Sequence, residues 1–418
     1  MPAPTYPIEK VRNMFPALKR TVNELPVAYF DGPGGSQVAG PVIRAVSEYM
    51  QKGVANLGGT YVTSRETRQI VERARASSAA LLGSDCENIA FGANMTTLAF
   101  RIARALSREW REGKGNIVVT ELDHHANVDP WKTAAEEKGL DVRTIQLNPD
   151  TLTLDDGKVD EVIDEQTELV AIGLASNVVG TINDVCRVVQ RAKEVDALAV
   201  IDGVHAVPHF LVDFKQLEAD ILFCSAYKFF GPHVGIVAVK RDLLERLKMY
   251  KLKPHPGGVP EKLETGTINF EGLVGVTEAV HFIAGFGTGQ SLRERIADGY
   301  KNIETHEKAL ADRLRAGLAD IEGVTLYQAP DPIPKTPTVA FRVTGVHPVE
   351  VCHRMAEQAI HIESGNFYAM TLIDRLGFSE SGGLIRAGLA PYNTEEEIDR
   401  LIDSVCSLSH NSSVEKIK

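Results

Sequence analysis

Three stretches of the sequence place chemically useful residues directly after a run of apolar residues. Asp202 ends the apolar run 198–202, Lys228 follows the run 220–224, and residues 93–97 (ANMTT) follow the run 89–92. In open α/β sheets, ligands bind at the carboxyl ends of the strands. We therefore expect a carboxylate, an amine and a hydroxyl-rich helix start to share one site.

This combination is the set that a pyridoxal phosphate site needs. A lysine amine condenses with the aldehyde of that cofactor, and a carboxylate keeps its pyridine nitrogen protonated. A helix N-terminus with hydroxyl groups receives the phosphate. Each residue alone has a simpler explanation, because an Asp at a strand end is most often a cap and a Lys before Gly-Pro is usually solvated. Their order and spacing together favour the cofactor site.

The centre of the chain alternates apolar runs with helical patterns, such as those at 97–110 and 185–195. The runs are nearly continuous in Val, Ile, Leu and Ala, as expected for strands that are covered on both faces. This alternation predicts an α/β fold with a mostly parallel sheet and helices on both of its faces. The predicted strands span residues 116–120, 169–174, 198–202, 220–224 and 235–240.

After about residue 285 the pattern changes. A long charged helical pattern at 291–320 precedes an apolar strand pattern at 338–343, and Thr394 and Glu397 have the spacing of a capping box. This second region is typical of a smaller α+β domain. We predict an N-terminal arm at 1–30 that packs on the small domain, a large pyridoxal phosphate-binding domain at 31–285 and a small C-terminal domain at 286–418.

The composition limits the classes of function. The residues are 44% apolar and 24% charged, and the formal net charge of −11 argues against nucleic-acid and anionic-membrane partners. No apolar run approaches the ~20 residues that span a membrane, and we expect no signal peptide. The dispersed cysteines lack CxxC spacing, which predicts reduced thiols in a cytoplasmic protein and no metal site. They are Cys86, Cys186, Cys224, Cys352 and Cys406.

Further motifs are short blocks that are spread over the chain. They are Asp123–Asn127 (DHHAN) with Pro130 and Trp131, Ala175–Gly180 (ASNVVG), Val200–Ala206 (VIDGVHA), Ser225–Pro232 (SAYKFFGP), Glu264–Asn269 (ETGTIN) and Arg386–Thr394 (RAGLAPYNT). In content and order they resemble the class V aminotransferase superfamily of fold-type I pyridoxal phosphate enzymes, in particular the cysteine desulfurase and selenocysteine lyase group. The resemblance runs from about Tyr29 to the C-terminus. It implies the fold-type I fold, the cofactor pyridoxal 5′-phosphate and a small amino-acid substrate.

The resemblance also implies roles around the cofactor ring. Lys228 resembles the lysine that forms the Schiff base and shuttles a proton, and Asp202 resembles the partner of the pyridine nitrogen. His124 resembles the imidazole that stacks on the ring. Asn177 and His205 match contacts to the ring hydroxyl, although the family has Gln where this chain has His205. We expect low-polarity surroundings to lower the pKa of Lys228.

The phosphate and substrate ends have counterparts as well. Thr96 and Ser225 match hydroxyl groups that bind the phosphate, and Met95 matches a residue that binds it through the backbone N–H. Thr267 resembles a threonine that the neighbouring subunit supplies, which implies a homodimer. Arg386 matches the arginine that holds the substrate α-carboxylate, a task for which its planar fork is suited.

The chain departs from the cysteine desulfurases at their nucleophile. Those enzymes carry a catalytic Cys before the last strand in a segment of the type Arg-Thr-Gly-His-His-Cys, and the aligned residues here are 363–369 (ESGNFYA). Tyr368 stands at the Cys position and Glu363 replaces the Arg. Persulfide chemistry requires a thiolate. The sequence therefore argues against a cysteine desulfurase.

Three functions remain open. The first is a lyase that performs β-elimination of the C–S lyase type, in which Tyr368 or Lys228 supplies a proton to the leaving group. The second is an aminotransferase or epimerase that acts at Cα. The third is a pyridoxal phosphate-binding protein without turnover, against which the intact Asp202, Lys228 and Arg386 argue. We predict a lyase, by analogy with enzymes that cut bonds to sulfur or selenium.

In this prediction Lys228, His124, Asp202 and Tyr368 are catalytic, and Arg386 and Glu363 bind the substrate. Glu363 is expected either to bind an amine or second polar group of the substrate or to pair with an arginine. Phe367 and Tyr368 are expected either to form an aromatic wall for an apolar side chain or to pack in the core.

Overall fold

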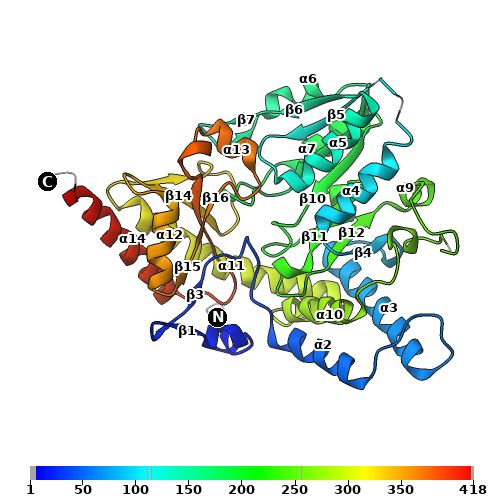
Figure 1. The fold of residues 1–418 in the computed structure, drawn as a ribbon, viewed down its shortest axis with the longest axis horizontal. Coiled ribbons are helices and arrows are strands. Elements are labelled where there is room, and N and C mark those ends of the chain that lie inside the picture. The colour runs from blue at the N-terminus through cyan, green and yellow to red at the C-terminus, as the bar shows by residue number, and fades with distance from the viewer. Residues whose placement is uncertain (1–5, 111, 114, 256, 416–418) are drawn as a thin grey trace.

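The computed structural model describes residues 6–110, 112–113, 115–255 and 257–415, with side chains described as far as Ser409. Two sheets organise these residues (Figure 1). A larger sheet lies in the first two thirds of the chain, and a smaller one lies in the last third. Among the described residues, no helix combines the length and the apolar character that crossing a membrane requires.

The main sheet has seven strands in the described residues, in the order β4-β12-β11-β10-β9-β5-β6. Strand β12 runs antiparallel to both neighbours, and the other strands are parallel to one another. The predicted α/β fold with a mostly parallel sheet is confirmed. The strands are β4 (Ile89–Gly92), β5 (Asn116–Thr120), β6 (Asp141–Ile145), β9 (Thr167–Gly173), β10 (Leu198–Asp202), β11 (Ile221–Ser225) and β12 (Gly235–Val239).

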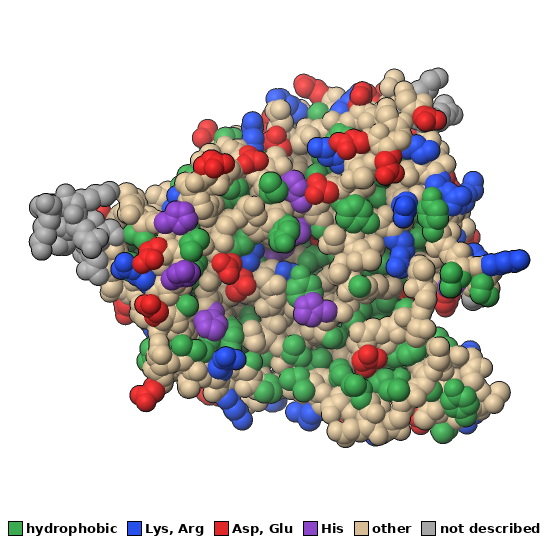
Figure 2. Space-filling view, in the orientation of Figure 1, with side chains coloured by type: hydrophobic (Ala, Val, Ile, Leu, Met, Phe, Trp, Pro, Cys, Tyr) green, Lys and Arg blue, Asp and Glu red, His purple; other side chains and the backbone are tan. Residues whose placement is uncertain are grey.

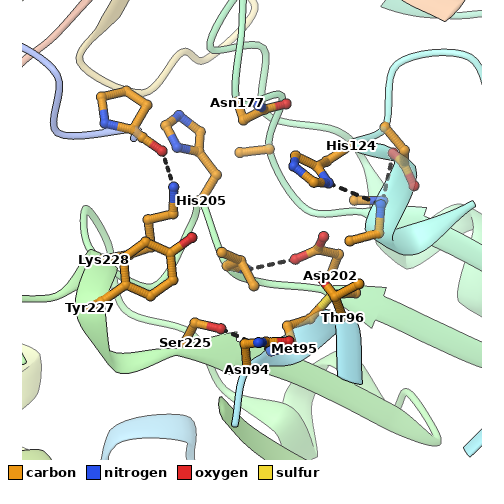
Figure 3. A pocket seen from close by; sticks show the side chains of 16 residues that line it. Asn94, Met95, Thr96, His124, Asn177, Asp202, His205, Ser225, Tyr227 and Lys228 are labelled. Atoms are coloured by element: carbon orange, nitrogen blue, oxygen red, sulfur yellow. Dashed lines mark hydrogen bonds between the residues drawn. The ribbon is translucent and has the colours of Figure 1, made fainter. Parts of the chain in front are cut away.

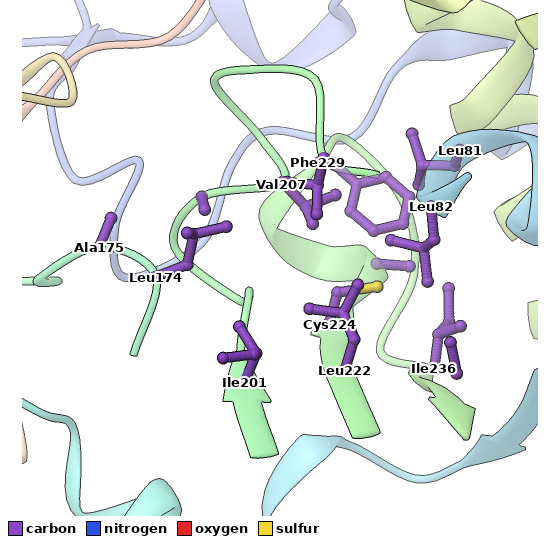
Figure 4. Close-up of a cluster of buried hydrophobic side chains, with 14 of the residues drawn as sticks. Leu81, Leu82, Leu174, Ala175, Ile201, Val207, Leu222, Cys224, Phe229 and Ile236 are labelled. Carbon is purple, nitrogen blue, oxygen red and sulfur yellow. The ribbon is translucent and has the colours of Figure 1, made fainter. Parts of the chain in front are cut away.

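Both faces of this sheet are buried because successive side chains of a strand point to opposite faces. In β10, Val200 packs in one apolar cluster and Ile201 in the other. Figure 4 shows Ile201 and Leu222 in the same buried cluster as Leu82. The cluster of Ile201 includes residues of α2 (Gly40–Lys52), α3 (Val62–Leu82), α7 (Val185–Glu194) and α10 (Phe270–Ala284). The cluster of Val200 includes residues of α4 (Met95–Leu106), α5 (Asp129–Lys138) and α9 (Arg241–Arg246).

The second sheet is antiparallel, with the order β13-β14-β17-β16. Its strands are β13 (Val324–Tyr327), β14 (Thr338–Val343), β16 (Glu363–Gly365) and β17 (Leu384–Gly388), and the helices of this region are α11 (Leu292–Ala319), α12 (Pro348–Glu357), α13 (Met370–Arg375) and α14 (Glu395–Glu415). The predicted capping box at the start of α14 is confirmed, because Glu397 N donates to Thr394 Oγ1 and Thr394 N donates to Glu397 Oε2.

The N-terminal residues contact this second region. Strand β3 (Ala28–Tyr29) pairs with β15 (Ile360–His361), and Asp31 forms a β-bridge with Gly388. The division of the chain into an arm and two domains remains a prediction. The remaining short elements are α1 (Ile8–Arg12), β1 (Thr21–Val22), β2 (Leu25–Pro26), β7 (Leu147–Asn148), β8 (Thr153–Leu154), α6 (Val159–Val162) and α8 (Phe214–Leu217).

One helix boundary differs from the sequence prediction. The pattern at 97–110 predicts a helix as far as Trp110, but α4 begins at Met95 and ends at Leu106. Asn94 sets the beginning, since its side chain accepts a hydrogen bond from Thr97 N. Trp110 lies beyond the helix and packs in the same apolar cluster, so its burial extended the apolar pattern past the real end.

Candidate active site

A cavity lies at the carboxyl ends of the central strands (Figure 3). Eight of the nine residues predicted to bind the cofactor line it, and Thr267 is the exception. The full lining is Pro33, Asn94, Met95, Thr96, Asp123, His124, Ala126, Gly173, Ala175, Asn177, Asp202, Val204, His205, Ser225, Tyr227 and Lys228. The strand ends thus meet where the parallel topology predicts.

Lys228 projects from the turn that follows β11. Its Nζ donates to the backbone oxygen of Pro33 and lies 4.9 Å from the ring centroid of Tyr227. Burial lowers the pKa of Lys228 to about 7, and the positive charge of Arg386 adds to the effect. The expected lowering is confirmed. A substantial fraction of this lysine is therefore a free amine near neutral pH.

Asp202 is the last residue of β10 and faces the cavity (Figure 3). Its Oδ1 accepts a hydrogen bond from Val204 N at 2.8 Å. Burial raises the pKa of Asp202 to about 6, while this hydrogen bond and the charge of Lys228 oppose the rise. The side chain is therefore mainly a carboxylate at neutral pH, as a partner for a protonated ring nitrogen must be.

His124 supplies a flat neutral ring at one wall. Its Nδ1 accepts a hydrogen bond from Ala126 N at 2.9 Å, so the proton of the neutral imidazole lies on Nε2. Burial lowers the pKa of His124 to about 4, and the charge of Lys228 adds to the effect. An uncharged ring next to a cationic lysine is suited to stacking on an aromatic group.

His205 is buried at the opposite side of the cavity from His124 (Figure 3). Its Nε2 lies 3.2 Å from Thr336 Oγ1 and 3.0 Å from Thr338 Oγ1. Burial lowers the pKa of His205. The imidazole is therefore neutral and held by the second sheet.

The start of α4 forms the end of the cavity that suits an anion. Thr96 lies at the second helical position, and Ser225 Oγ accepts a hydrogen bond from Met95 N at 3.1 Å. The first turn of a helix carries unpaired N–H groups and a partial positive charge. The N–H of Met95, predicted to bind phosphate, is thus engaged by Ser225 in this structure.

Arg386 lies in β17, next to the cavity, with its side chain only 4% exposed. Its Nη1 donates to Asn177 O at 2.9 Å, and its Nη2 donates to Asp31 Oδ1 at 2.8 Å. The ring of Phe367 covers the guanidinium at 4.0 Å. The predicted carboxylate-binding arginine is therefore beside the site and already holds a carboxylate of this chain.

Residues 366–369 border the cavity. Phe367 and Tyr368 have positive φ angles of 51° and 58°, which are uncommon for residues with large side chains. Two hydrogen bonds hold the segment, from Asn177 Nδ2 to Phe367 O at 2.9 Å and from His125 N to Tyr368 O at 2.7 Å. The ring of Tyr368 stacks on His124 at 5.4 Å and remains 71% exposed. The segment is thus fixed to the wall of the cavity.

Four predicted site residues are absent from the cavity lining: Arg386 and Tyr368 lie beside the cavity, and the other two are Thr267 and Glu363. Thr267 is exposed in the segment before α10. Glu363 lies opposite Arg386 in the pairing of β16 with β17, and its exposed side chain forms no ion pair in the described part of the chain. Neither residue contacts the lysine or the carboxylate at the strand ends.

Sequence reasoning missed Asp31, which pairs with Arg386, and Pro33, which contacts Lys228. A signal for Asp31 was present, because it follows the apolar run 27–30 directly and is followed by a glycine-rich turn. That is the pattern that singled out Asp202. The ring of Phe367 over Arg386 had no comparable signal.

The donor set fits pyridoxal phosphate. An amine, a carboxylate, a neutral imidazole ring and a helix start with hydroxyl groups converge on one cavity. Asn177 Oδ1 is buried without a hydrogen-bond partner in the described residues, so it is available to an O–H group of a ligand.

Comparison with known proteins yields matches along nearly the whole chain. Residues 28–401 match the family model "Aminotransferase class-V". A cysteine desulfurase of Enterobacter sp. (strain 638) is 31% identical over 427 aligned positions, which cover 97% of this chain and 99% of the relative. A cysteine desulfurase of Pectobacterium carotovorum subsp. carotovorum (strain PC1) is 30% identical, with 95% and 97% covered.

Solved structures agree with these matches. The apo cysteine desulfurase of Thermococcus onnurineus NA1 aligns with a TM-score of 0.85 at 26% identity, covering 96% of this chain and 98% of that one. The cysteine desulfurase CsdA of Escherichia coli, in an S-sulfonic acid form, aligns with a TM-score of 0.82 at 26% identity, with 95% and 97% covered.

Proposed function

The chain belongs to the class V aminotransferase family and is a pyridoxal 5′-phosphate-dependent enzyme, and from this premise we propose that it is a lyase that eliminates a sulfur-linked group from the β-carbon of an amino acid. One observation carries the proposal. In the part of the chain that the structure describes, no cysteine lines the cavity, and Tyr368, which the resemblance aligns with the nucleophilic cysteine of the desulfurases, stacks on His124 at its edge.

The cysteines are unsuited to accept sulfur from a substrate in this cavity. Cys224 lies on β11 and is buried in an apolar cluster, and burial raises the pKa of its thiol. Cys352 is buried on α12, and burial raises the pKa of its thiol to about 11. Cys86, Cys186 and Cys406 lie on other elements and are absent from the cavity lining. A thiolate nucleophile is therefore not at hand, which supports elimination over persulfide formation.

The proposed roles of the residues follow from their positions. When bound, the cofactor captures the substrate amine and takes up the electron pair of a broken Cα bond. Lys228 Nζ removes the proton from substrate Cα, a role that its lowered pKa favours. Arg386 binds the α-carboxylate. Asp202, His124, Asn177 and His205 surround the ring, and Thr96, Ser225 and the start of α4 bind the phosphate.

Elimination requires a proton at the leaving sulfur. The Cα–H and Cβ–S bonds break, a double bond forms between Cα and Cβ, and the sulfur leaves as a thiol. The Tyr368 hydroxyl is the proposed donor of that proton, because its ring is at the exposed edge of the cavity against His124. Water then converts the unsaturated amine to a keto acid and ammonia. An aminotransferase or epimerase would not need this donor.

We also propose a homodimer in which Thr267 reaches the phosphate site of the partner copy. Thr267 is exposed and lies outside its own cavity, which is consistent with such a role. Figure 2 shows apolar side chains gathered at the lower right, over the region of α2 and α3. Helix α2 and the start of α3 carry the exposed apolar residues Ile43, Met50, Tyr61 and Val62, so they are a candidate contact surface. The dispersed free thiols support a reducing, cytoplasmic environment.

A product assay on the cofactor-loaded protein tests the proposed reaction. The panel contains cysteine, S-substituted cysteines, their sulfoxides and common amino-group donors, and Lys228→Ala is the control. Pyruvate and ammonia in equal amounts are expected from S-substituted cysteines. Release of a keto acid without ammonia would instead identify an aminotransferase, and inversion at Cα without cleavage would identify an epimerase.

A further inference from the structure

We propose that Asp31 is a built-in competitor for the substrate carboxylate, and that it thereby selects against dianionic substrates. The inference rests on the proposed role of Arg386. The starting point is that Arg386, buried on β17, already has a carboxylate partner from the N-terminal part of the chain.

The backbone holds Asp31 in this place. Asp31 bridges Gly388, which lies two residues after Arg386 on the same strand. The residues on either side of Asp31 also form hydrogen bonds with Gly388. Gly388 N donates to Phe30 O at 2.6 Å, and Gly32 N donates to Gly388 O at 3.3 Å. The position of the carboxylate beside the guanidinium is therefore set by strand pairing.

The contact uses only part of the arginine fork. Nη2 donates to Asp31 Oδ1, Nη1 donates to Asn177 O, and Nε has no partner in the described residues. Nε and Nη2 form the edge that binds a carboxylate through two parallel hydrogen bonds. Asp31 already takes one of the two nitrogens of this edge, so a substrate carboxylate must compete with it there.

The two partners differ in their freedom to move. The side chain of Asp31 is 40% exposed, whereas that of Arg386 is 4% exposed. Displaced into water, the carboxylate is solvated, but the buried guanidinium needs an anion at all times. Asp31 thus neutralises Arg386 without substrate and exchanges with the substrate carboxylate when it arrives.

This exchange shapes specificity. The displaced Asp31 carboxylate stays near the entering ligand, and Glu363 lies opposite Arg386 across the strand pair. A second negative charge on the substrate is therefore repelled by Asp31 and, from outside the cavity, by Glu363. The substrates favoured are amino acids whose side chains are uncharged or cationic.

Two substitutions remove the Asp31 carboxylate from Arg386. Asp31→Asn removes the charge. Gly34→Ala keeps the charge, but its new methyl group would overlap the Asp31 carboxylate at the arginine. The φ angle of Gly34 is not in the left-handed region, so alanine fits the backbone.

Calorimetric binding of propionate and succinate to the cofactor-loaded protein tests the inference, because neither ligand can react. We expect both variants to bind propionate about fivefold more tightly than the wild type, since one competing ion pair is lost. In Asp31→Asn, succinate binding should improve more than propionate binding. Asp399→Asn, which removes a carboxylate from Arg313 elsewhere, is the matched control and should leave both affinities unchanged.

If both variants bind propionate as tightly as the wild type or more weakly, the inference is overturned, because Asp31 would then only position Arg386. If Asp31→Asn fails to fold, the Gly34→Ala result decides alone. Arg386→Leu separates this result from the proposed function and should abolish binding. Wild-type propionate affinity in Arg386→Leu would show that Arg386 is not the carboxylate site, which would overturn both.

Discussion

The floor and the edge of the cavity are built in different ways. The floor consists of Asp202, Ser225 and Lys228, which lie at or just after the ends of adjacent strands in the main sheet. The edge consists of Asp31, which forms a β-bridge with Gly388, and Tyr368, which lies in a turn, and both are open to solvent. Strands of the seven-stranded sheet fix the floor, whereas one β-bridge and a few hydrogen bonds hold the edge.

This difference indicates a division of labour. An amine and a carboxylate on a rigid floor supply the chemistry that is common to pyridoxal phosphate enzymes. In the proposed reaction the edge borders the substrate carboxylate and the leaving group, so we expect it to decide which bond breaks and which substrate enters. Changes in the floor should abolish activity, and changes at the edge should alter selectivity.

The largest effect is expected from Lys228→Ala. Loss of the amine that moves the Cα proton should lower turnover by about 1000-fold or more. The variant should still bind pyridoxal phosphate noncovalently, because the helix start and Asp202 remain. Pyruvate release and the absorbance of the bound cofactor are the measurements. Lys215→Ala, at an exposed ion pair with Asp85, is the control. Wild-type turnover in Lys228→Ala would contradict the role of the floor.

Asp202→Ala should have the next largest effect. Without the carboxylate, the pyridine nitrogen is not held protonated, so turnover should fall by about 100-fold and dialysis should remove the cofactor faster. Cofactor retention and kcat are measured together. Asp85→Asn, at the surface, is the control. A normal rate with every substrate would count against the assigned role.

Tyr368→Phe tests the edge, since it removes one hydroxyl group and leaves the ring that stacks on His124. Elimination of a poor leaving group such as an alkyl thiol should slow about tenfold to 100-fold, because the proton donor is lost. A good leaving group needs little protonation and should be nearly unaffected. The ratio of the two rates is the measurement. An equal loss for both leaving groups would indicate that Tyr368 acts by packing alone.

The smallest effect concerns pH. The pKa of Lys228 is about 7, so its amine is protonated below that pH and free above it. The rate at which the apoprotein captures pyridoxal phosphate should therefore rise with pH through about 7. Arg386→Leu removes the second cause of the lowering, and the midpoint should move upward by about one pH unit or less. If the midpoint of this pH dependence in the wild-type protein lies near the ordinary pKa of lysine, burial does not lower the pKa of Lys228.

The sequence predicted the floor well because strands that are buried on both faces leave long apolar runs. The run 198–202 corresponds to β10, and the polar residues that follow such runs line the cavity as expected. Here, local pattern and tertiary position coincide.

The edge was harder to predict. The contact of Asp31 with Arg386 joins residues that are far apart in the chain, and it depends on a bridge between the N-terminal segment and β17. The positive φ angles of Phe367 and Tyr368 could not be anticipated, because residues of these types rarely adopt them. Glu363 was expected to bind the substrate from its place in the aligned segment, and it lies outside the cavity. Thr267 was expected to serve the neighbouring subunit, and it lies outside the cavity of its own chain.

The most direct test of the central claim is to treat the cofactor-loaded protein with L-cysteine and to measure products and protein mass together. The account predicts pyruvate, ammonia and sulfide if cysteine is a substrate. It also predicts no alanine and no sulfur atom added to any of the five cysteines. Alanine formed together with one added sulfur atom on a cysteine would contradict it, because a thiol of this chain would then have accepted the sulfur.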